Sequence, residues 1–244
     1  MSKIVIITGG GRGIGATVAL AGARQGWRMA LGYRTNRPRA EQVVAAVEKA
    51  GGEAIAIAAD VAVEADVARL FATVDRELGR PSGLVNSAGI LGPSGRLEAV
   101  EGAALTELWA INVTGTMLCC REAIRRMSTK LGGSGGAIVN LSSAASRLGG
   151  AGANIPYAVS KGAIDSLTFG LGQEVAAEGI RVNAVSPGVI DTEIQPPGRV
   201  EQIGPILPMK RVGRPEEVAE AILFLLSDAA SYVSGAVLSV SGGR

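Results

Sequence analysis

Short runs of aliphatic and β-branched residues alternate along the chain with longer stretches of helical periodicity. The apolar runs, each short enough for a buried strand, are residues 4–7, 28–33, 54–58, 84–86, 137–141, 181–185 and 236–240. Apolar positions recur every three or four residues in 14–25, 40–50, 64–78, 103–130, 156–178 and 215–226. Because strands that alternate with helices build parallel sheets, the pattern predicts an α/β fold: a seven-stranded, doubly wound parallel sheet with helices on both faces.

One segment interrupts this alternation. Residues 187–215 contain several prolines and mix polar with apolar positions. An irregular stretch of this length in a compact domain is usually a binding loop or a lid. The chain has 244 residues and fits a single domain, 1–244, in which we expect a lid at about 189–214 to cover the substrate.

The composition excludes several classes of function. The chain has no histidine, which removes every mechanism that needs a Ser-His-Asp or Cys-His arrangement or a histidine-bound metal. Its 24 Lys and Arg against 22 Asp and Glu leave a net charge of +2, far from the positive field of a protein that binds nucleic acid or an anionic membrane. No run approaches the roughly 18 consecutive apolar residues of a membrane span. We therefore expect neither a nucleic-acid nor a membrane partner.

The cysteines indicate a cellular compartment. Cys119 and Cys120 are adjacent in the sequence, so they cannot join distant segments, and without histidine they form no tetrahedral zinc set. We expect no metal, and a cytoplasmic protein whose thiols stay reduced.

A glycine-rich turn follows the first predicted strand and leads directly into the first predicted helix. It reads Thr8-Gly9-Gly10-Gly11-Arg12-Gly13-Ile14-Gly15. Glycines let the backbone approach a pyrophosphate, and the N-terminus of a helix presents free N–H groups and a partial positive charge to it. The turn predicts a Rossmann-like dinucleotide site; the alternative is a tight turn between strand and helix with no ligand.

The order Thr8, Gly9, Gly13, Gly15 resembles the Thr-Gly-x-x-x-Gly-x-Gly motif of short-chain dehydrogenases/reductases. Further matches are Asn86-Ser87-Ala88-Gly89, similar to the family's Asn-Asn-Ala-Gly with Ser87 replacing the second asparagine, then Asn112, Ser143, Tyr157 with Lys161, and the segment 181–188. The resemblance covers nearly the whole chain. The cofactor contacts that it and the glycine motif imply are Gly9, Arg12, Gly13, Ile14, Gly15, Tyr33, Arg34, Asp60, Val61, Asn86, Ala88, Gly89, Tyr157, Lys161, Pro187, Gly188 and Thr192.

The end of the second predicted strand bears on which nicotinamide cofactor binds. An acidic residue there binds the ribose 2′-hydroxyl of NAD, whereas a nearby arginine accommodates the 2′-phosphate of NADP. Here Tyr33 stands where the acid is expected, Arg34 follows it, and Arg12 lies in the glycine turn. Two guanidiniums can bind a phosphate through charge-assisted hydrogen bonds. We predict NADP(H) over NAD(H), the alternative being that both arginines are solvated surface residues.

Tyr157 and Lys161 are four residues apart on a predicted helix, so both side chains can reach one pocket. A phenol has a pKa near 10, and a neighbouring cation favours the phenolate. Our hypothesis is that Lys161 and the positive nicotinamide lower the pKa of Tyr157, which donates the proton in reduction and accepts it in oxidation. The resemblance implies that Ser143 hydrogen-bonds the substrate oxygen and that Asn112 holds a water linking Lys161 to solvent.

The assignment of Ser143 has one competitor, the preceding Ser142. The interval from Ser143 to Tyr157 is one residue longer than is common in the family, and the glycine-rich stretch 149–152 can absorb the extra residue.

The predicted activity is NADP(H)-dependent hydride transfer to or from a small carbonyl or secondary alcohol substrate. A 3-oxoacyl-[acyl-carrier-protein] reductase is one alternative, although Glu178 stands where the family often has a basic residue. A glucose or other sugar dehydrogenase is a second alternative, and a non-catalytic dinucleotide sensor is a third, from a different class. The resemblance also implies a homotetramer, or a homodimer, paired through the long helices and the last strand.

Overall fold

The computed structural model describes residues 2–195 and 197–244, which build a parallel sheet of seven strands in the order β3-β2-β1-β4-β5-β6-β7. The strands are β1 (Ile4–Thr8), β2 (Arg28–Tyr33), β3 (Glu53–Ala58), β4 (Gly83–Asn86), β5 (Gly136–Leu141), β6 (Ile180–Pro187) and β7 (Val237–Val240). The helices are α1 (Gly13–Arg24), α2 (Arg37–Lys49), α3 (Glu64–Glu77), α4 (Gly102–Trp109), α5 (Gly115–Met127), α6 (Ala145–Leu148), α7 (Ile155–Glu174), α8 (Arg199–Ile203) and α9 (Pro215–Leu226). The predicted doubly wound α/β architecture is confirmed.

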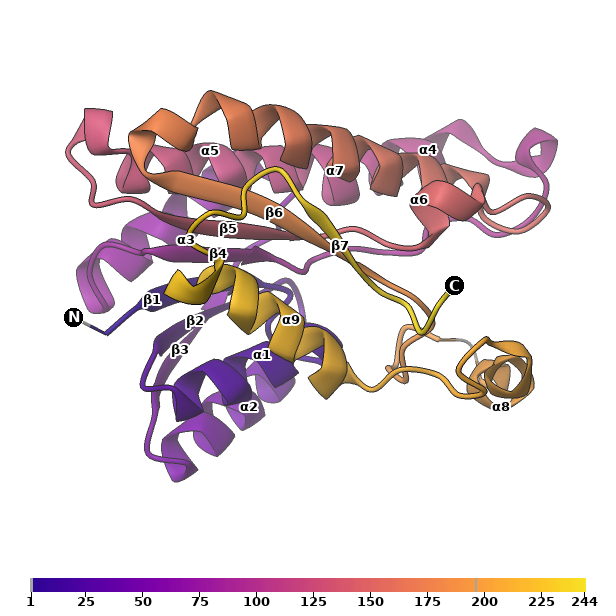
Figure 1. Cartoon of the computed structure of the whole chain (residues 1–244), viewed down its shortest axis with the longest axis horizontal. Coiled ribbons are helices and arrows are strands. Elements are labelled where there is room, and N and C mark those ends of the chain that lie inside the picture. Colours follow the sequence, from indigo (N-terminus) through magenta and orange to yellow (C-terminus); the bar gives the residue numbers. More distant parts are fainter. Residues whose placement is uncertain (1, 196) are drawn as a thin grey trace.

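Helices cover both faces of the sheet (Figure 1). On one face α1, α2 and α9 pack on a core that includes Val18, Leu31 and Ile222, and on the other α3 and α5 pack on a second core that includes Phe71 and Ile138. The central strands are buried on both sides, which explains why their sequences are continuously apolar rather than alternating.

The strand order reverses between β1 and β4, and this reversal positions the site. Chain connections leave β1 and β4 toward opposite sides, so a crevice opens at their carboxyl ends. Thr8 pairs with Asn86 across the two strands, and the Thr8 Oγ1 accepts hydrogen bonds from the Ser87 and Ala88 amides at 3.1 Å each. The glycine turn after β1 is thereby fixed beside the loop after β4.

The stretch predicted as one helix, 103–130, consists of α4, a π-helical segment Ala110–Thr114, and α5, which ends at Met127. By length and composition alone this continuous helix, Gly102–Met127, is apolar enough to cross a membrane. Its Cys119, Cys120 and Met127 are instead buried in the core beneath the sheet. We interpret it as a core helix.

The expected loop after β6 contains local structure. It includes α8 and a short 3-10 turn, and its two ends are joined by a bridge between Ile190 and Gly213. Figure 1 shows α8 beyond the carboxyl ends of the strands, near the C-terminus. A second short helix, α6, also went unpredicted because four residues are too few for a periodic pattern.

Candidate active site

The glycines of the turn after β1 are each required by a different contact. Gly9 has φ +67°, and a Cβ there would lie 3.0 Å from the Ala88 backbone nitrogen. Gly13 has φ +51°, and a Cβ on Gly15 would lie 2.5 Å from the Gly9 carbonyl oxygen. Side chains are therefore excluded at Gly9, Gly13 and Gly15, which leaves the backbone of the turn open to a ligand at these positions.

Helix α1 begins at Gly13 and supplies the positive end of its dipole. Its N-cap residue, Arg12, makes no side-chain hydrogen bond to the helix. The N–H groups of the first turn therefore keep their capacity to bind an anion.

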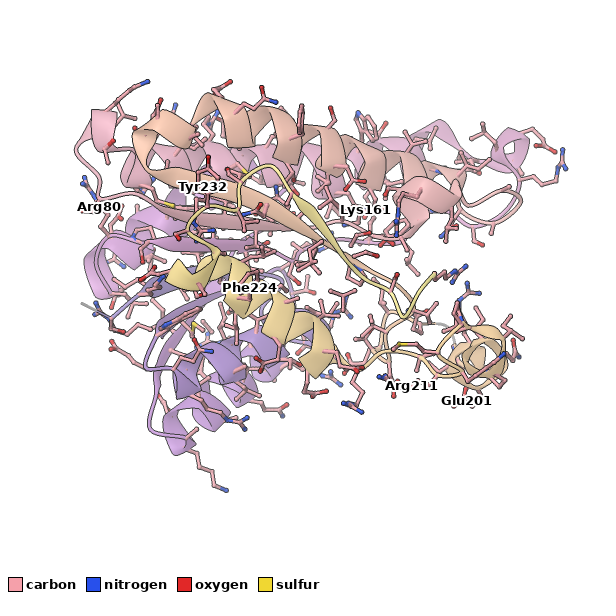
Figure 2. All side chains as sticks on the ribbon, viewed as in Figure 1. Arg80, Lys161, Glu201, Arg211, Phe224 and Tyr232 are labelled. Carbon is pink, nitrogen blue, oxygen red and sulfur yellow. The ribbon has the colours of Figure 1, made fainter. Side chains whose placement is uncertain are left out.

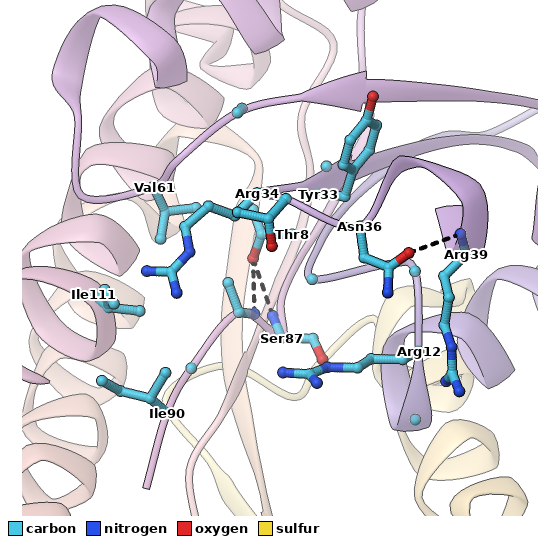
Figure 3. A pocket seen from close by; sticks show the side chains of 18 of the residues that line it. Thr8, Arg12, Tyr33, Arg34, Asn36, Arg39, Val61, Ser87, Ile90 and Ile111 are labelled. Atoms are coloured by element: carbon cyan, nitrogen blue, oxygen red, sulfur yellow. Dashed lines mark hydrogen bonds between the residues drawn. The ribbon is translucent and has the colours of Figure 1, made fainter. Parts of the chain in front are cut away.

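A cavity of about 460 Å³ opens at this point (Figure 3). The predicted cofactor contacts that line it are Gly9, Arg12, Gly13, Ile14, Tyr33, Arg34, Asp60, Val61, Ala88, Gly89 and Thr192. The cavity thus joins the glycine turn, the end of β2, the loop after β3 and the loop after β4. Its size is within the range of small-molecule sites.

The remaining predicted contacts lie outside the walls of this cavity. They are Gly15, Asn86, Tyr157, Lys161, Pro187 and Gly188. Asn86 is buried, and its Nδ2 donates to Asn140 Oδ1 at 2.9 Å, while Asn140 Nδ2 donates to Thr168 Oγ1 at 2.9 Å. This chain of bonds ties β4 to β5 and α7, so Asn86 braces the floor beneath the cavity.

Asp60, after β3, lies at the cavity wall and also stabilises the turn in which it lies by hydrogen bonds. Its Oδ1 accepts a hydrogen bond from the Ala62 amide at 3.0 Å, and its amide donates to Asp66 Oδ2 at 3.0 Å. Helix α3 begins four residues later, at Glu64, so Asp60 makes an Asx turn rather than the helix cap that was the alternative interpretation.

The two predicted arginines approach the cavity from opposite walls. In Figure 3 the Arg12 and Arg34 side chains extend into it from the glycine turn and from the end of β2, while the Tyr33 ring points away from both guanidiniums. An Arg34 nitrogen lies 3.9 Å from a carboxylate oxygen of Glu107 on α4. Arg12 makes no ion pair within 2–195 and 197–244.

A third arginine, Arg39, also lines the cavity, and the sequence analysis missed it. The predicted second helix began at residue 40, whereas α2 begins at Arg37 and places Arg39 in its first turn. Asn36 caps this helix, with Pro38 at one of its first positions. That Asn-x-Pro signal, read as a helix start, would have found it.

Tyr157, near the start of α7, lies close to Ser143, which follows β5. Burial raises the pKa of Tyr157 and the Ser143 hydroxyl lowers it, burial being the larger effect. We expected a lowered pKa. The expectation counted the charge of Lys161 but left out the loss of water around the phenol.

Lys161 lies one helical turn after Tyr157, buried between α7 and the sheet (Figure 2). Its Nζ donates to the Leu141 carbonyl at 2.7 Å and stands 5.7 Å from the centre of the Tyr157 ring. Burial lowers the pKa of Lys161 from 10.5 to about 8, against a smaller raising effect of Asp165.

This lowered pKa predicts a pH-dependent stability. Between about pH 8 and 10.5 the unfolded chain holds a proton on Lys161 that the folded chain has lost, so the free energy of unfolding rises with pH in this window. Relative to Lys161→Met, the wild type is expected to gain up to about 3 kcal/mol between pH 7 and 10. Urea unfolding at several pH values measures this, with Lys49→Met as an exposed-lysine control. A pH-independent difference between wild type and Lys161→Met would contradict it.

Asn112 lies in the π-helical segment, where its side chain is fully occupied. Its Oδ1 accepts from the Ile90 amide and its Nδ2 donates to the Ile90 carbonyl, each at 2.9 Å, and Nδ2 also lies 3.1 Å from Ser160 Oγ. Ser160 in turn donates to the Tyr157 carbonyl at 2.7 Å. Asn112 therefore ties the loop after β4 to the turn of α7 between Tyr157 and Lys161.

Gly89 lies between the cavity and the predicted catalytic residues. A Cβ at position 89 would lie 3.3 Å from Asn112 Oδ1 and 3.8 Å from Lys161 Nζ. Since Gly89 also lines the cavity, these predicted catalytic residues and the predicted cofactor site are neighbours.

The two serines after β5 have different surroundings. Ser142 is buried, and its Oγ lies 3.4 Å from the Lys161 carbonyl, whereas Ser143 reaches Tyr157. Positive φ angles at Gly149, Gly150 and Gly152 turn the chain between α6 and α7, the stretch expected to absorb the extra residue of the interval.

Comparisons with known proteins agree with this architecture. A family model described as enoyl-(acyl carrier protein) reductase matches residues 9–244. An uncharacterised oxidoreductase, YgfF, of Escherichia coli (strain K12) is 48% identical, covering 99% of this chain and 99% of its own. A short-chain dehydrogenase/reductase from Serratia marcescens has a solved structure with TM-score 0.92 at 33% identity, covering 99% of this chain and 97% of its own.

The chain belongs to the short-chain dehydrogenase/reductase family. It is therefore an oxidoreductase that acts on CH–OH or C=O groups with NAD or NADP. Another relative, the human 3-oxoacyl-[acyl-carrier-protein] reductase, is 37% identical over 100% of this chain and 98% of its own.

Proposed function

We propose that this dehydrogenase/reductase transfers hydride between NADP(H) and a small carbonyl or secondary alcohol, with Tyr157 as the proton donor and acceptor. One observation carries the proposal. Tyr157 and Ser143 lie close together, with Lys161 one turn away, beside the Gly89 that lines the cavity.

The cavity fits a dinucleotide in shape and in chemistry. Its floor is a turn whose glycines at positions 9, 13 and 15 leave no room for a side chain, and the free N–H groups of α1 face the same space. The turn would hold the pyrophosphate, Asp60 and Val61 would face the adenine, and Thr192 would contact the carboxamide. When bound, the cofactor supplies or accepts the hydride, and the protein supplies everything else.

Tyr157 and Ser143 share the handling of the substrate oxygen. In reduction, the Tyr157 hydroxyl donates its proton to the carbonyl oxygen while the Ser143 hydroxyl donates a hydrogen bond to the same atom. Lowering a phenol pKa from 10 toward neutrality takes about three units, or roughly 4 kcal/mol. Burial acts against this, so the nearby cations, Lys161 and the nicotinamide, have to provide more than that amount.

Asn112 acts as a positioning residue. Its amide is engaged with Ile90 and Ser160, so it holds the walls around Lys161 in place. We propose that the water linking Lys161 to solvent is held at this π-helical segment.

The preference for NADP(H) rests on charge. Arg12 and Arg34 extend into the cavity, and Tyr33 offers no carboxylate to repel a 2′-phosphate. The nearest carboxylate to Arg34 is that of Glu107, at 3.9 Å on a half-exposed side chain, which competes only weakly for the guanidinium.

A 3-oxoacyl-[acyl-carrier-protein] reductase is the second candidate, favoured by the printed activity of the human relative. An acidic carrier protein requires basic residues where it docks. Glu178 binds Lys130 at 3.0 Å and accepts a hydrogen bond from Ser128 at 2.5 Å, so it neutralises one of the basic groups on that surface. This pairing favours a small free substrate.

The decisive assay follows NADPH absorbance with a panel of diketones, aldehydes, sugars and 3-oxoacyl thioesters. Turnover of small carbonyls is the expected result. Activity confined to the carrier-bound thioester would favour the second candidate, activity only on sugars would make the protein a sugar dehydrogenase, and binding without turnover would make it a sensor.

The proposal also covers the oligomeric state and the cellular location of the protein. Exposed apolar side chains gather on the long helices (Trp109, Met117, Val159, Phe169) and near α9 and β7 (Phe224, Tyr232, Leu238; Figure 2). We propose a cytoplasmic homotetramer of single-domain chains, each with a substrate lid at 189–214. Light scattering is expected to give about four times the chain mass of 24.7 kDa.

A further inference from the structure

A second cavity, of about 540 Å³, lies between α1, α2 and the loop after β6. Six residues line both this cavity and the cofactor cavity: Gly11, Arg12, Gly13, Arg39, Thr192 and Glu193. These six residues form the wall between the two spaces. The wall is made by three separate parts of the chain: the glycine turn, the start of α2 and the loop after β6.

An ion pair between Arg39 and Glu193 joins the two ends of this wall, α2 and the loop after β6. Arg39 is held on one side by the first turn of α2, where its amide donates to Asn36 Oδ1 at 3.1 Å (Figure 3). Glu193 belongs to the loop after β6, on the other side of the glycine turn. The two side chains therefore reach across the outside of the turn and meet.

The loop is fixed where it begins, just before Glu193. The Asp191 amide donates to the Gly213 carbonyl, and the Gly213 amide to the Val189 carbonyl, each at 2.9 Å. The Thr192 side chain packs on the glycine turn: a Cβ at Gly13 would be 3.5 Å from the Thr192 Cγ2. Glu193 is thus the first residue of the loop that can extend to α2.

We propose that the Arg39–Glu193 ion pair is a strap that holds the loop after β6 closed over the cofactor diphosphate and slows cofactor release. This rests on the proposed cofactor site, because the diphosphate at the N-terminus of α1 lies beside the wall that the pair completes. Arg39 and Glu193 are positioning residues in this scheme: they act on the loop and make no bond to the cofactor.

The pair is suited to opening in each catalytic cycle. The Arg39 and Glu193 side chains are 45% and 50% exposed, so water replaces either partner readily. Exposed ion pairs are weak, and breaking one corresponds to at most about a fivefold change in an equilibrium or a rate.

The test is a double-mutant cycle of Arg39→Ala, Glu193→Ala and the double variant. Stopped-flow nicotinamide fluorescence measures the release rates of both NADPH and NADH, which requires no turnover and no substrate. Each single variant is expected to speed release by about three- to fivefold, for both cofactors, and the double variant by no more than either single one. Arg37→Ala is the matched control, because Arg37 pairs with Glu41 on the same helix and lines neither cavity.

The cycle separates the strap from a direct phosphate contact. If Arg39→Ala speeds release of NADPH alone, or if Glu193→Ala has no effect, Arg39 binds the cofactor itself and the strap is wrong. Unchanged rates in all variants also overturn it. A failure of the proposed function would appear elsewhere, as absent carbonyl turnover or a preference for NADH, and would leave the release rates readable.

Discussion

Tyr157→Phe is expected to lower kcat for carbonyl reduction by about 10³- to 10⁴-fold while the Kd for NADPH changes less than about threefold. Proton transfer by a positioned side chain contributes roughly 10²- to 10⁴-fold, and with no histidine in the chain no neighbouring imidazole can take over. The ring remains, so the shape of the pocket is retained. Steady-state kinetics and a fluorescence titration measure the two quantities.

Tyr232→Phe is the matched control, since it deletes the same hydroxyl from a fully exposed ring. It should leave kcat unchanged. If Tyr157→Phe kept wild-type turnover, the proton would have to come from another group, and the proposed mechanism would be abandoned.

The second large effect concerns the cofactor. Replacing both Arg12 and Arg34 by alanine is expected to lower kcat/KM for NADPH by about 100-fold or more and to leave the value for NADH within about threefold. A hydrogen bond to a charged group contributes about 1.5–3 kcal/mol, and NADH lacks the phosphate that both guanidiniums would bind. The ratio of the two kcat/KM values, measured with one carbonyl substrate, is the readout.

In the wild type the same ratio should favour NADPH. Arg37→Ala serves again as the control, because it removes an arginine three residues after Arg34 that does not line the cavity. Equal losses for NADPH and NADH in the double variant would show that the arginines support the fold or the common part of the cofactor, and the 2′-phosphate assignment would fall.

The sheet and its glycine turn could be predicted because their causes are local. Strand β2 occupies the predicted residues, and β1 extends the prediction by one residue, Thr8. The turn that follows is specified by glycines whose positive φ angles and close contacts tolerate no side chain. Local sequence and tertiary structure agree here, and prediction succeeds where they agree.

The structure brings the predicted catalytic residues close together, but their burial and pKa values were not predicted from the sequence. Motif spacing placed Tyr157, Lys161 and Ser143 together, yet spacing contains no information on burial. The pKa of Lys161 is lowered and that of Tyr157 raised because the surrounding sheet and helices exclude water. Only the assembled structure determines how completely a side chain is enclosed.

Contacts between distant segments were beyond prediction for a related reason. Arg39 and Glu193 are 154 positions apart and carry no shared motif. Each is an ordinary surface residue in the sequence. Their meeting depends on how the loop after β6 returns to the glycine turn.

The π-helical segment limits where this protein can accept insertions and deletions. An α-helix turns by about 100° per residue, so the widened turn at Ala110–Thr114 resets the phase between α4 and α5. Leu108 before it and Cys119 after it, eleven residues or about three turns apart, are both buried. Helices tolerate insertions and deletions best toward their ends. Inserting or deleting one residue in the π-helical segment would rotate α4 relative to α5 and turn the buried face of one of them out of the core. The number of residues in the middle of this helix is therefore fixed, and the π-helical segment that fixes it also contains Asn112.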